Sequence, residues 1–565
     1  MSLPSAQSPS SGRAGSLTAT GVVRAHGAAV VLDGADLTVA PGARVAVVGA
    51  NGVGKSTLLR ILAGIEVPDA GRVVRAPADL AVAYLAQEHD AVPGESVRAH
   101  LARRTGVAAA EALMEARAAD LSDAADASAT QDYADAVERW VAAGGGDFDA
   151  RTAAVCEEVG LGQALLDRPA IALSGGQAGR LRLAAVLLAR HDVVLLDEPT
   201  NDLDFAGLAL LEEWVSRTPA AVVTVSHDRA FLAGTARQVV ELDDHTRRAT
   251  VYDGGWDAYL EERERARQRQ YDAHAAYTSE RDRLREQVRR HQAWEATGMK
   301  RVRTSGESDK YIRWGMAKGA ESQAGRSRRA ERALERLERT RRVDKPWEGW
   351  DLRLEVVPER RSGDVVVRLE GAVFERGRFR IGPVDLDLRW RDRLAVVGPN
   401  GSGKTTVLLG ILGRVPLRAG HRRIGPGVVV GELDQARAPF GGPEALVDSF
   451  TAASGLRPGE ARSLLAKFGL GAEHVGRAGS SLSPGERSRA QLAALSAAGV
   501  NCLVLDEPTN HLDLPAIEQL EGVLERYPGT VVLVTHDRAL LDRFAATLVL
   551  DVDDVPSLDP GERRG

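Results

Sequence analysis

Cysteine is scarce in this chain, with only Cys156 and Cys502 among 565 residues. Two cysteines so far apart exclude a disulfide framework and any zinc or iron–sulfur site built on cysteine, and they suit a reducing compartment. Long apolar runs are missing too, since no stretch approaches the ~18–20 residues of a membrane helix. We therefore expect a cytoplasmic protein that does not span a bilayer by itself.

The first fifteen residues lack the apolar core of a signal peptide. Residues 1–15 (MSLPSAQSPSSGRAG) are rich in Ser, Pro and Gly, and we interpret them as a disordered tail. The chain is long enough for more than one domain, and its apolar content of 44% is ordinary for a protein with packed cores.

Charge is distributed unevenly along the chain. The net charge is −6, yet residues 261–342 carry 23 Lys and Arg against 14 Asp and Glu, so this segment is +9 and the remainder −15. A basic insert in an acidic body suggests contact with a polyanion. A pair of solvated, charged helices would have the same composition, so charge alone leaves both readings open.

Four motifs occur twice in the same order. They are GANGVGKST at 49–57 and GPNGSGKTT at 398–406, LSGGQ at 173–177 and LSPGE at 482–486, VVLLDEPTNDLD at 193–204 and CLVLDEPTNHLD at 502–513, and the segments around His227 and His536. Ser174 precedes Ser483 by 309 residues, whereas Lys55 precedes Lys404 by 349. The first copy therefore has about 40 additional residues, which fall within about 95–150.

The pattern of apolar runs predicts an α/β fold. In each copy an apolar strand leads into a glycine-rich loop and a helix, and further apolar runs such as VVLLD read as buried strands. Strands that alternate with helices imply mostly parallel sheets covered on both faces. We expect a first α/β domain at 16–256 with a helical arm within about 95–150, a helical linker at 257–345, and a second α/β domain at 346–565.

The glycine-rich loops predict phosphate binding. In GxxxxGK[ST] the glycines allow backbone N–H groups to surround phosphates at a helix N-terminus. Lys55 and Lys404 would hold the β- and γ-phosphates, and Ser56 and Thr405 would bind Mg²⁺. The candidate loop residues are Gly49, Asn51, Gly52, Gly54, Lys55, Ser56 and Thr57 in the first copy, and Gly398, Asn400, Gly401, Gly403, Lys404, Thr405 and Thr406 in the second.

Acidic and polar residues follow the apolar strands of both copies. An aspartate at the end of such a strand would hold Mg²⁺, and the glutamate after it can polarise an attacking water. The expected catalytic residues are Glu198, Glu507, His227 and His536, where the histidines would contact the γ-phosphate. The expected metal ligands are Ser56, Gln87, Asp197, Thr405, Gln435 and Asp506, where the two glutamines would sense both Mg²⁺ and the γ-phosphate.

Over nearly all of residues 16–555 these motifs resemble the ATP-binding cassette superfamily. LSGGQ and LSPGE resemble its signature motif, which contacts the γ-phosphate held by the opposite domain. The resemblance implies two composite sites that bind ATP and Mg²⁺ and hydrolyse ATP. The signature residues are Ser483, Gly485 and Glu486 for the site of the first copy, and Ser174, Gly175, Gly176 and Gln177 for that of the second. The usual adenine-stacking tyrosine is missing; His26 and Phe374 lie near its place, and ordinary packing would explain either residue.

The segment between the copies predicts a helical hairpin. Residues 257–293 contain neither Pro nor Gly and would form a rod of ~55 Å. Apolar residues on this rod and on the return segment suggest an antiparallel pair of helices. They are Tyr277, Leu284 and Val288, and then Ala330, Leu334 and Leu337. The basic tip, at about 294–321, includes Lys310 and Arg313 for phosphates and Tyr311 or Trp314 for stacking on bases; an inert loop is the alternative.

Two cassettes, a charged helical linker, no membrane domain and paired DEPTN motifs together resemble the ABC-F family. The resemblance implies two P-loop ABC-type ATPase domains joined by an antiparallel α-helical hairpin. It also implies a monomeric cytoplasmic ATPase that binds the ribosome and directs its linker tip toward the peptidyl-transferase centre, where the tip contacts ribosomal RNA and tRNA.

Several functions agree with these features. We favour antibiotic resistance by ribosomal protection over a housekeeping factor that gates or rescues ribosomes. The ATPase subunit of an exporter with a separate membrane protein is another alternative, but it gives the basic linker no role. A DNA-repair ATPase would need cysteine sets or much longer coiled coils than this sequence has.

Overall fold

The computed structural model describes most of the chain. The described residues are 15–27, 29–86, 91–123, 127–244, 246–304, 328–329, 331–340, 361–377, 379–433, 440–510 and 512–556. The chain divides into two compact units, Met1–Asp257 with Leu352–Gly565, and Ala258–Asp351. The first unit contains both sets of repeated motifs, and the second is the segment between them.

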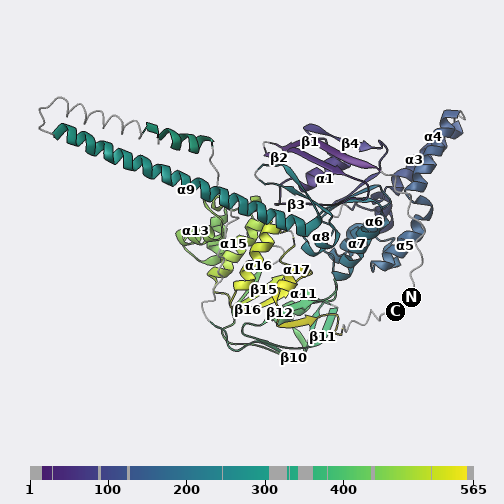
Figure 1. Ribbon diagram of the computed structural model, residues 1–565. Coiled ribbons are helices and arrows are strands. Elements are labelled where there is room, and N and C mark those ends of the chain that lie inside the picture. Colours follow the sequence, from purple (N-terminus) through teal and green to yellow (C-terminus); the bar gives the residue numbers. More distant parts are fainter. Residues whose placement is uncertain are drawn as a thin grey trace. The chain divides into compact units, whose positions relative to one another are not determined.

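The first cassette has two sheets (Figure 1). A small antiparallel sheet has the order β2-β1-β4, and a larger sheet has the order β5-β6-β7-β3-β8-β9, parallel except for β9. The strands are β1 Ser16–His26, β2 Ala29–Val39, β3 Arg44–Gly49, β4 Ala70–Ala76, β5 Val82–Leu85, β6 Val193–Asp197, β7 Ala221–Val225, β8 Gln238–Leu242 and β9 Ala249–Asp253. Every residue of β6 and β7 is buried, which explains why their sequences are continuous apolar runs without alternation.

The helices of the first cassette include an inserted pair. The helices are α1 Lys55–Ala63, α2 Val97–Arg104, α3 Val107–Asp123, α4 Ala127–Ala142, α5 Phe148–Glu158, α6 Gly175–Leu188, α7 Phe205–Arg217 and α8 Arg229–Thr235, with 3-10 turns η1 Gly145–Asp147, η2 Gln163–Leu165 and η3 Ala170–Ala172. In Figure 1, α3 and α4 lie side by side and extend away from the large sheet of this cassette. These two helices occupy the stretch in which the first copy is longer than the second.

The second cassette repeats this plan. Its sheets have the orders β11-β10-β13 and β14-β15-β16-β12-β17, and the second of them is parallel throughout. The strands are β10 Val365–Arg376, β11 Phe379–Arg389, β12 Arg393–Val397, β13 Leu417–Ile424, β14 Val430–Leu433, β15 Cys502–Asp506, β16 Thr530–Val534 and β17 Leu548–Asp551. The helices are α11 Lys404–Ile411, α12 Leu446–Ser454, α13 Pro458–Lys467, α14 Ala472–Val475, α15 Pro484–Ala497, α16 Leu514–Arg526 and α17 Arg538–Phe544, with the 3-10 turn η5 Gly479–Ser481. The predicted α/β class with mostly parallel sheets is confirmed.

The middle unit is helical where it is described. Helix α9 covers Gly255–Thr304, so it continues beyond Ala293, where the sequence led us to end it. Residues 331–340 are also helical, and Arg285 Nη2 lies 2.9 Å from Glu338 Oε1. This ion pair joins residues 53 positions apart, as expected for an antiparallel hairpin. The predicted contact residues of the tip, from Lys310 to Trp314, lie outside the described residues.

Within the described part of the chain, we find no helix with both the length and the apolar character that a membrane crossing requires.

Candidate active sites

Each glycine-rich loop wraps around the lysine that begins the next helix. Gly54 caps α1 with a φ of 109°, and a Cβ there would lie 2.9 Å from the carbonyl oxygen of Val31, so only glycine fits. Lys55 Nζ donates to the carbonyl oxygen of Gly49 at 2.8 Å. Lys404 Nζ makes the equivalent bond to Gly398 at 2.8 Å. The ammonium groups of both lysines are therefore held against the backbone of their loops, where phosphates would bind.

The two predicted catalytic glutamates have unusual backbone conformations. Glu198 and Glu507 have φ values of 49° and 46°, in the left-handed region that a glutamate rarely adopts. The backbone N–H of each donates at 2.9 Å to the adjacent strand, to Val225 and Val534 respectively. Such conformations occur mainly at functional sites. Here the conformation places each carboxylate directly after its buried strand.

Burial changes the proton affinity of the groups around the lysines. It raises the pKa of Glu198 to about 7, although the Lys55 charge acts in the opposite direction. Burial also raises the pKa of Glu507. The pKa of His536 falls to about 4, first because of burial and then because of the Lys404 charge. Lys404 Nζ lies 2.7 Å from His536 Nε2, so the lysine donates and the histidine is neutral.

A single cavity brings the second P-loop together with the signature motif of the first cassette. Its volume is about 910 Å³, within the usual range for sites of nucleotide-sized ligands. Its lining includes Ser174, Gly175, Gly176 and Gln177 from the first cassette, and Asn400, Gly401, Gly403, Lys404, Thr405, Thr406, Asp506, Glu507 and His536 from the second. These are the residues that the resemblance assigns to this composite site, apart from Gln435, which lies outside the described residues, and Gly398, which binds Lys404.

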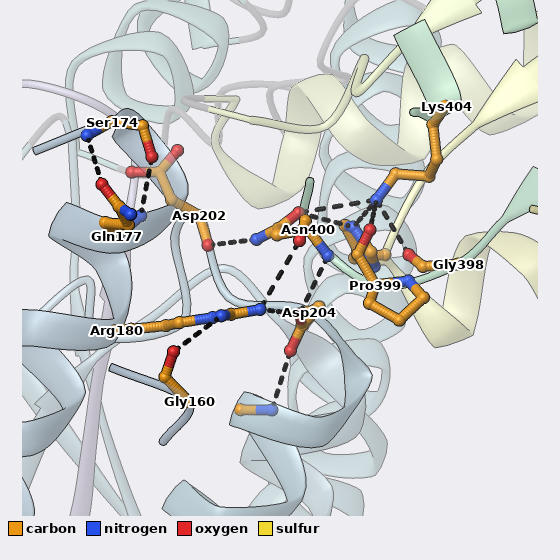
Figure 2. A network of polar contacts seen from close by, with 12 residues as sticks. Gly160, Ser174, Gln177, Arg180, Asp202, Asp204, Gly398, Pro399, Asn400 and Lys404 are labelled. Carbon is orange, nitrogen blue, oxygen red and sulfur yellow. Dashed lines mark hydrogen bonds and ion pairs between the residues drawn. The ribbon is translucent and has the colours of Figure 1, made fainter. Parts of the chain in front are cut away.

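Two aspartates of the first cassette hold the second P-loop (Figure 2). The backbone N–H of Asn400 donates to Asp204 Oδ2 at 2.9 Å, and the Asn400 side-chain amide donates to the carbonyl oxygen of Asp202 at 2.7 Å. Arg180 Nη2 lies 3.7 Å from the same Asp204 oxygen. Figure 2 shows Asn400 between these aspartates and Lys404. The contact between the cassettes therefore reaches the lysine that would bind phosphate.

The first P-loop has a matching contact with the second cassette. The backbone N–H of Asn51 donates to Asp513 Oδ2 at 3.0 Å. On the same side, Asp197 accepts bonds from the Ser56 hydroxyl at 3.1 Å and from the Tyr84 hydroxyl at 2.9 Å. His227 Nε2 lies 3.1 Å from Glu198 Oε1. The structure thus brings together five of the residues expected at the first site: Lys55, Ser56, Asp197, Glu198 and His227.

The second signature motif forms a helix cap. The Ser483 hydroxyl accepts from the backbone N–H of Glu486, and Glu486 accepts from the backbone N–H of Ser483. Ser174 and Gln177 form the same box at the start of α6. Among the described residues, Ser483 and Glu486 bond within the second cassette, and Gly485 lies next to Ala516 of the same cassette. Gln87, the remaining residue predicted for the first site, lies outside the described residues.

Sequence reasoning missed several residues of the sites. Asp204 and Asp513 end the repeated DEPTN motifs at equivalent positions, and that repetition was the signal that could have identified them. Tyr84 had no such signal. The candidate stacking residue Phe374 is fully buried, so its position fits ordinary packing in the core, the alternative given above, and not stacking on adenine. Phe379 and Arg376, not Phe374, line the cavity.

The polar atoms of both sites fit Mg²⁺ and a triphosphate. At the two sites, five buried atoms of Glu198, Glu507, His227 and His536 have no hydrogen-bond partner among the described residues: Oε2 of Glu198, Oε1 of Glu507, Nδ1 and Nε2 of His227, and Nδ1 of His536. Such buried atoms are rare unless a ligand, ion or water satisfies them. Asp197 and Ser56 supply the carboxylate and hydroxyl oxygens that Mg²⁺ prefers.

Comparisons with known proteins agree with this geometry. The sequence family described as ABC transporter matches residues 32–201 and 381–510. The tylosin resistance ATP-binding protein TlrC of Streptomyces fradiae is 35% identical over 94% of this chain and 96% of its own length. The energy-dependent translational throttle protein EttA of Mycobacterium tuberculosis is 32% identical over 92% of this chain and 88% of its own length.

A solved structure shares the fold. The archaeal ribosome recycling factor aABCE1, in complex with the ribosomal stalk protein aP1, has a TM-score of 0.55 at 18% identity, over 94% of this chain and 87% of that chain. At that identity the likeness concerns the fold alone. With two cassettes in one chain and matches over nearly its whole length, this protein belongs to the ATP-binding cassette superfamily and, within it, to the ABC-F family.

Proposed function

We propose that this chain hydrolyses ATP at two composite sites and thereby opens and closes its two cassettes. The cavity that joins residues 174–177 to the second P-loop carries this proposal. Lys404, His536 and Ser174 would contact one triphosphate from both sides. Binding would then favour the closed arrangement, and loss of the γ-phosphate contacts would favour the open one.

The catalytic roles follow from the chemistry of the side chains. Glu198 and Glu507 would orient the attacking water and accept its proton, which requires the ionised carboxylate. Lys55 and Lys404 would neutralise phosphate charge. When Mg²⁺ is bound, it would supply further positive charge beside the phosphates. Asp197 and Ser56 would hold it in the first site, with Asp506 and Thr405 in the second.

We further infer that the protein acts on the ribosome in the cytoplasm as a monomer. A basic segment between two acidic cassettes suits a polyanion such as ribosomal RNA or tRNA. The proposed domains are 16–256 with the arm within about 95–150, the linker 257–345 with its tip at about 294–321, and 346–565. The tip would point toward the peptidyl-transferase centre when the cassettes close.

Antibiotic resistance by ribosomal protection is the role that we favour. It is supported by TlrC, a relative named for tylosin resistance, which matches almost end to end. A housekeeping role in translation is the second candidate, because EttA, named as a translational throttle, matches with nearly the same identity. Inhibitory concentrations of a panel of ribosome-targeting drugs, measured with and without the gene, separate the two roles. A shift for any drug supports resistance, and no shift for all of them supports the housekeeping role.

The basic tip should be needed for ribosome-dependent function. We expect reversal of charge at Arg301, Arg303, Lys310 and Arg313 to lower ribosome co-sedimentation about tenfold or more, since each lost phosphate contact weakens binding to RNA. ATP hydrolysis without ribosomes should stay within about twofold of wild type, because the sites lie in the cassettes. Equal losses of both activities would instead assign these residues a role in folding.

Hydrolysis at the first site should increase with pH. In the Glu507→Gln variant only the first site would turn over, and Glu198, with a pKa of about 7, is mostly protonated below that pH. Because the ionised form is the base, the rate should rise about tenfold between pH 6 and pH 8. Phosphate release at saturating ATP measures this rise. A flat profile would contradict the role of Glu198 as the base.

A further inference from the structure

Helices α7 and α16 follow the DEPTN motifs, and each is held by the opposite cassette at two points. In α16 the first point is Asp513, the N-cap, which accepts from the backbone N–H of Asn51 in the first P-loop. The second is Glu521, two turns further along. Its carboxylate binds Arg229 of the first cassette, with Nη1 at 3.1 Å from Oε2. Arg229 stands two residues after His227, so both points belong to the first site.

Helix α7 repeats this arrangement for the second site. Its N-cap Asp204 accepts from the backbone N–H of Asn400 in the second P-loop. Further along the helix, Glu212 Oε1 lies 3.1 Å from Arg538 Nη1. Arg538 stands two residues after His536. Each helix thus spans from the P-loop to the histidine segment of one site in the opposite cassette.

We call the two ion pairs between the cassettes, Arg229–Glu521 and Arg538–Glu212, clamps, and they differ in strength. The Glu521 side chain is 2% exposed and also binds Arg543 of its own cassette at 2.8 Å, whereas Glu212 is 26% exposed. Buried ion pairs are little screened by salt, and loss of one partner leaves a costly buried charge. Half-exposed pairs such as Glu212–Arg538 contribute far less.

Other charged groups face both clamps. Asp537 and Glu518 lie close enough to Arg229 to act on its charge. Asp228 likewise lies close enough to Arg538 and Glu212 to interact with their charges. The arginine of each clamp therefore lies among carboxylates of the opposite cassette, which strengthens its attachment to the interface.

We propose that Arg229 with Glu521, and Arg538 with Glu212, are positioning residues that each hold one nucleotide site closed, and that the buried clamp holds the first site closed more strongly than the exposed one holds the second. This inference deepens the proposed function, because it assumes that both sites bind ATP. The clamps would act by pressing α16 or α7, and with it Asp513 or Asp204, against the P-loop of the opposite cassette.

Equilibrium binding of a fluorescent ATP analogue to the full chain tests the proposal one site at a time. A Lys404→Ala background leaves the first site to bind, and a Lys55→Ala background leaves the second. In the Lys404→Ala background, Arg229→Gln should raise the dissociation constant of the first site about tenfold or more. In the Lys55→Ala background, the same substitution should change the dissociation constant of the second site by less than about twofold. Glu212→Gln should do the reverse, with a rise of about fivefold at the second site alone.

A neighbouring residue provides the matched control. Among the described residues, Glu213 makes no bond to the second cassette. It pairs with Arg217 on its own helix, with Arg217 Nη1 at 2.6 Å from Glu213 Oε1, so Glu213→Gln should leave both sites unchanged. The exchange Glu212→Arg with Arg538→Glu should restore binding at the second site, which a merely structural loss would not allow. Equal weakening of both sites by either single variant, or no rescue by the exchange, overturns the proposal. Because hydrolysis is not measured, a chain that binds ATP without cleaving it would refute the proposed ATPase activity and leave the clamps standing.

Discussion

Replacement of Glu198 and Glu507 together by Gln is expected to lower ATP turnover by about 10²–10⁴-fold while ATP still binds. Glutamine keeps the size of the side chain and the left-handed backbone, but it cannot accept the proton of the attacking water. Since hydrolysis would no longer release the contacts across the composite sites, the cassettes should stay closed. Phosphate release and binding of a fluorescent ATP analogue measure the two effects separately.

The same variant also tests the ribosome proposal. If closure aims the linker at the ribosome, the double variant should co-sediment with ribosomes in ATP and should block growth when expressed. A control with Glu213→Gln and Glu525→Gln changes the net charge by the same amount at exposed positions and should behave as wild type. A variant that binds ATP without turnover, yet sediments apart from ribosomes, would retain the ATPase assignment and refute the ribosome proposal.

Local patterns were enough to predict the sites that lie within one cassette. The P-loop lysines, the strands that end at Asp197 and Asp506, and the glutamates that follow them are all specified by short segments with a fixed spacing. Such segments fold locally, because the glycines permit the turn and the apolar runs require burial on both faces of the sheet. The geometry around Lys55 and Lys404 therefore followed from the motifs themselves.

Contacts between the cassettes could not be predicted in the same way. Asp204 binds Asn400 across 196 positions of sequence, and Glu521 binds Arg229 across 292. The sequence around Asp204 or Glu521 does not indicate which residue of the other cassette each one binds. Carboxylates on a helix are usually solvated. Only the docking of one cassette on the other distinguishes Glu212 from its exposed neighbour Glu213.

The end of α9 shows a second limit of sequence reasoning. We ended the rod at about Ala293 because residues 257–293 contain neither Pro nor Gly. Gly298 follows soon after and disfavours a helix by about 1 kcal/mol relative to alanine. The structure continues the helix through that glycine to Thr304. A single unfavourable residue costs less than the hydrogen bonds that a long helix gains by continuing. The unfavourable propensity of one glycine is too weak to end the helix.

Phe374→Ala is expected to lower the stability of the second cassette by about 3–5 kcal/mol, because it removes a large, fully buried side chain. The ring lies against α11, so that a Cβ at Gly410 would be 2.5 Å from it, and neighbouring residues cannot easily fill the space. Thermal unfolding should show a lower midpoint for this cassette, with ATP affinity of the folded protein little changed. Phe379→Ala should do the opposite, since Phe379 is only partly buried and lines the cavity. A Phe374→Ala variant that keeps its midpoint but loses ATP affinity would return Phe374 to the role of adenine-stacking residue, and would mean that the nucleotide reaches deeper into the small sheet than the cavity does.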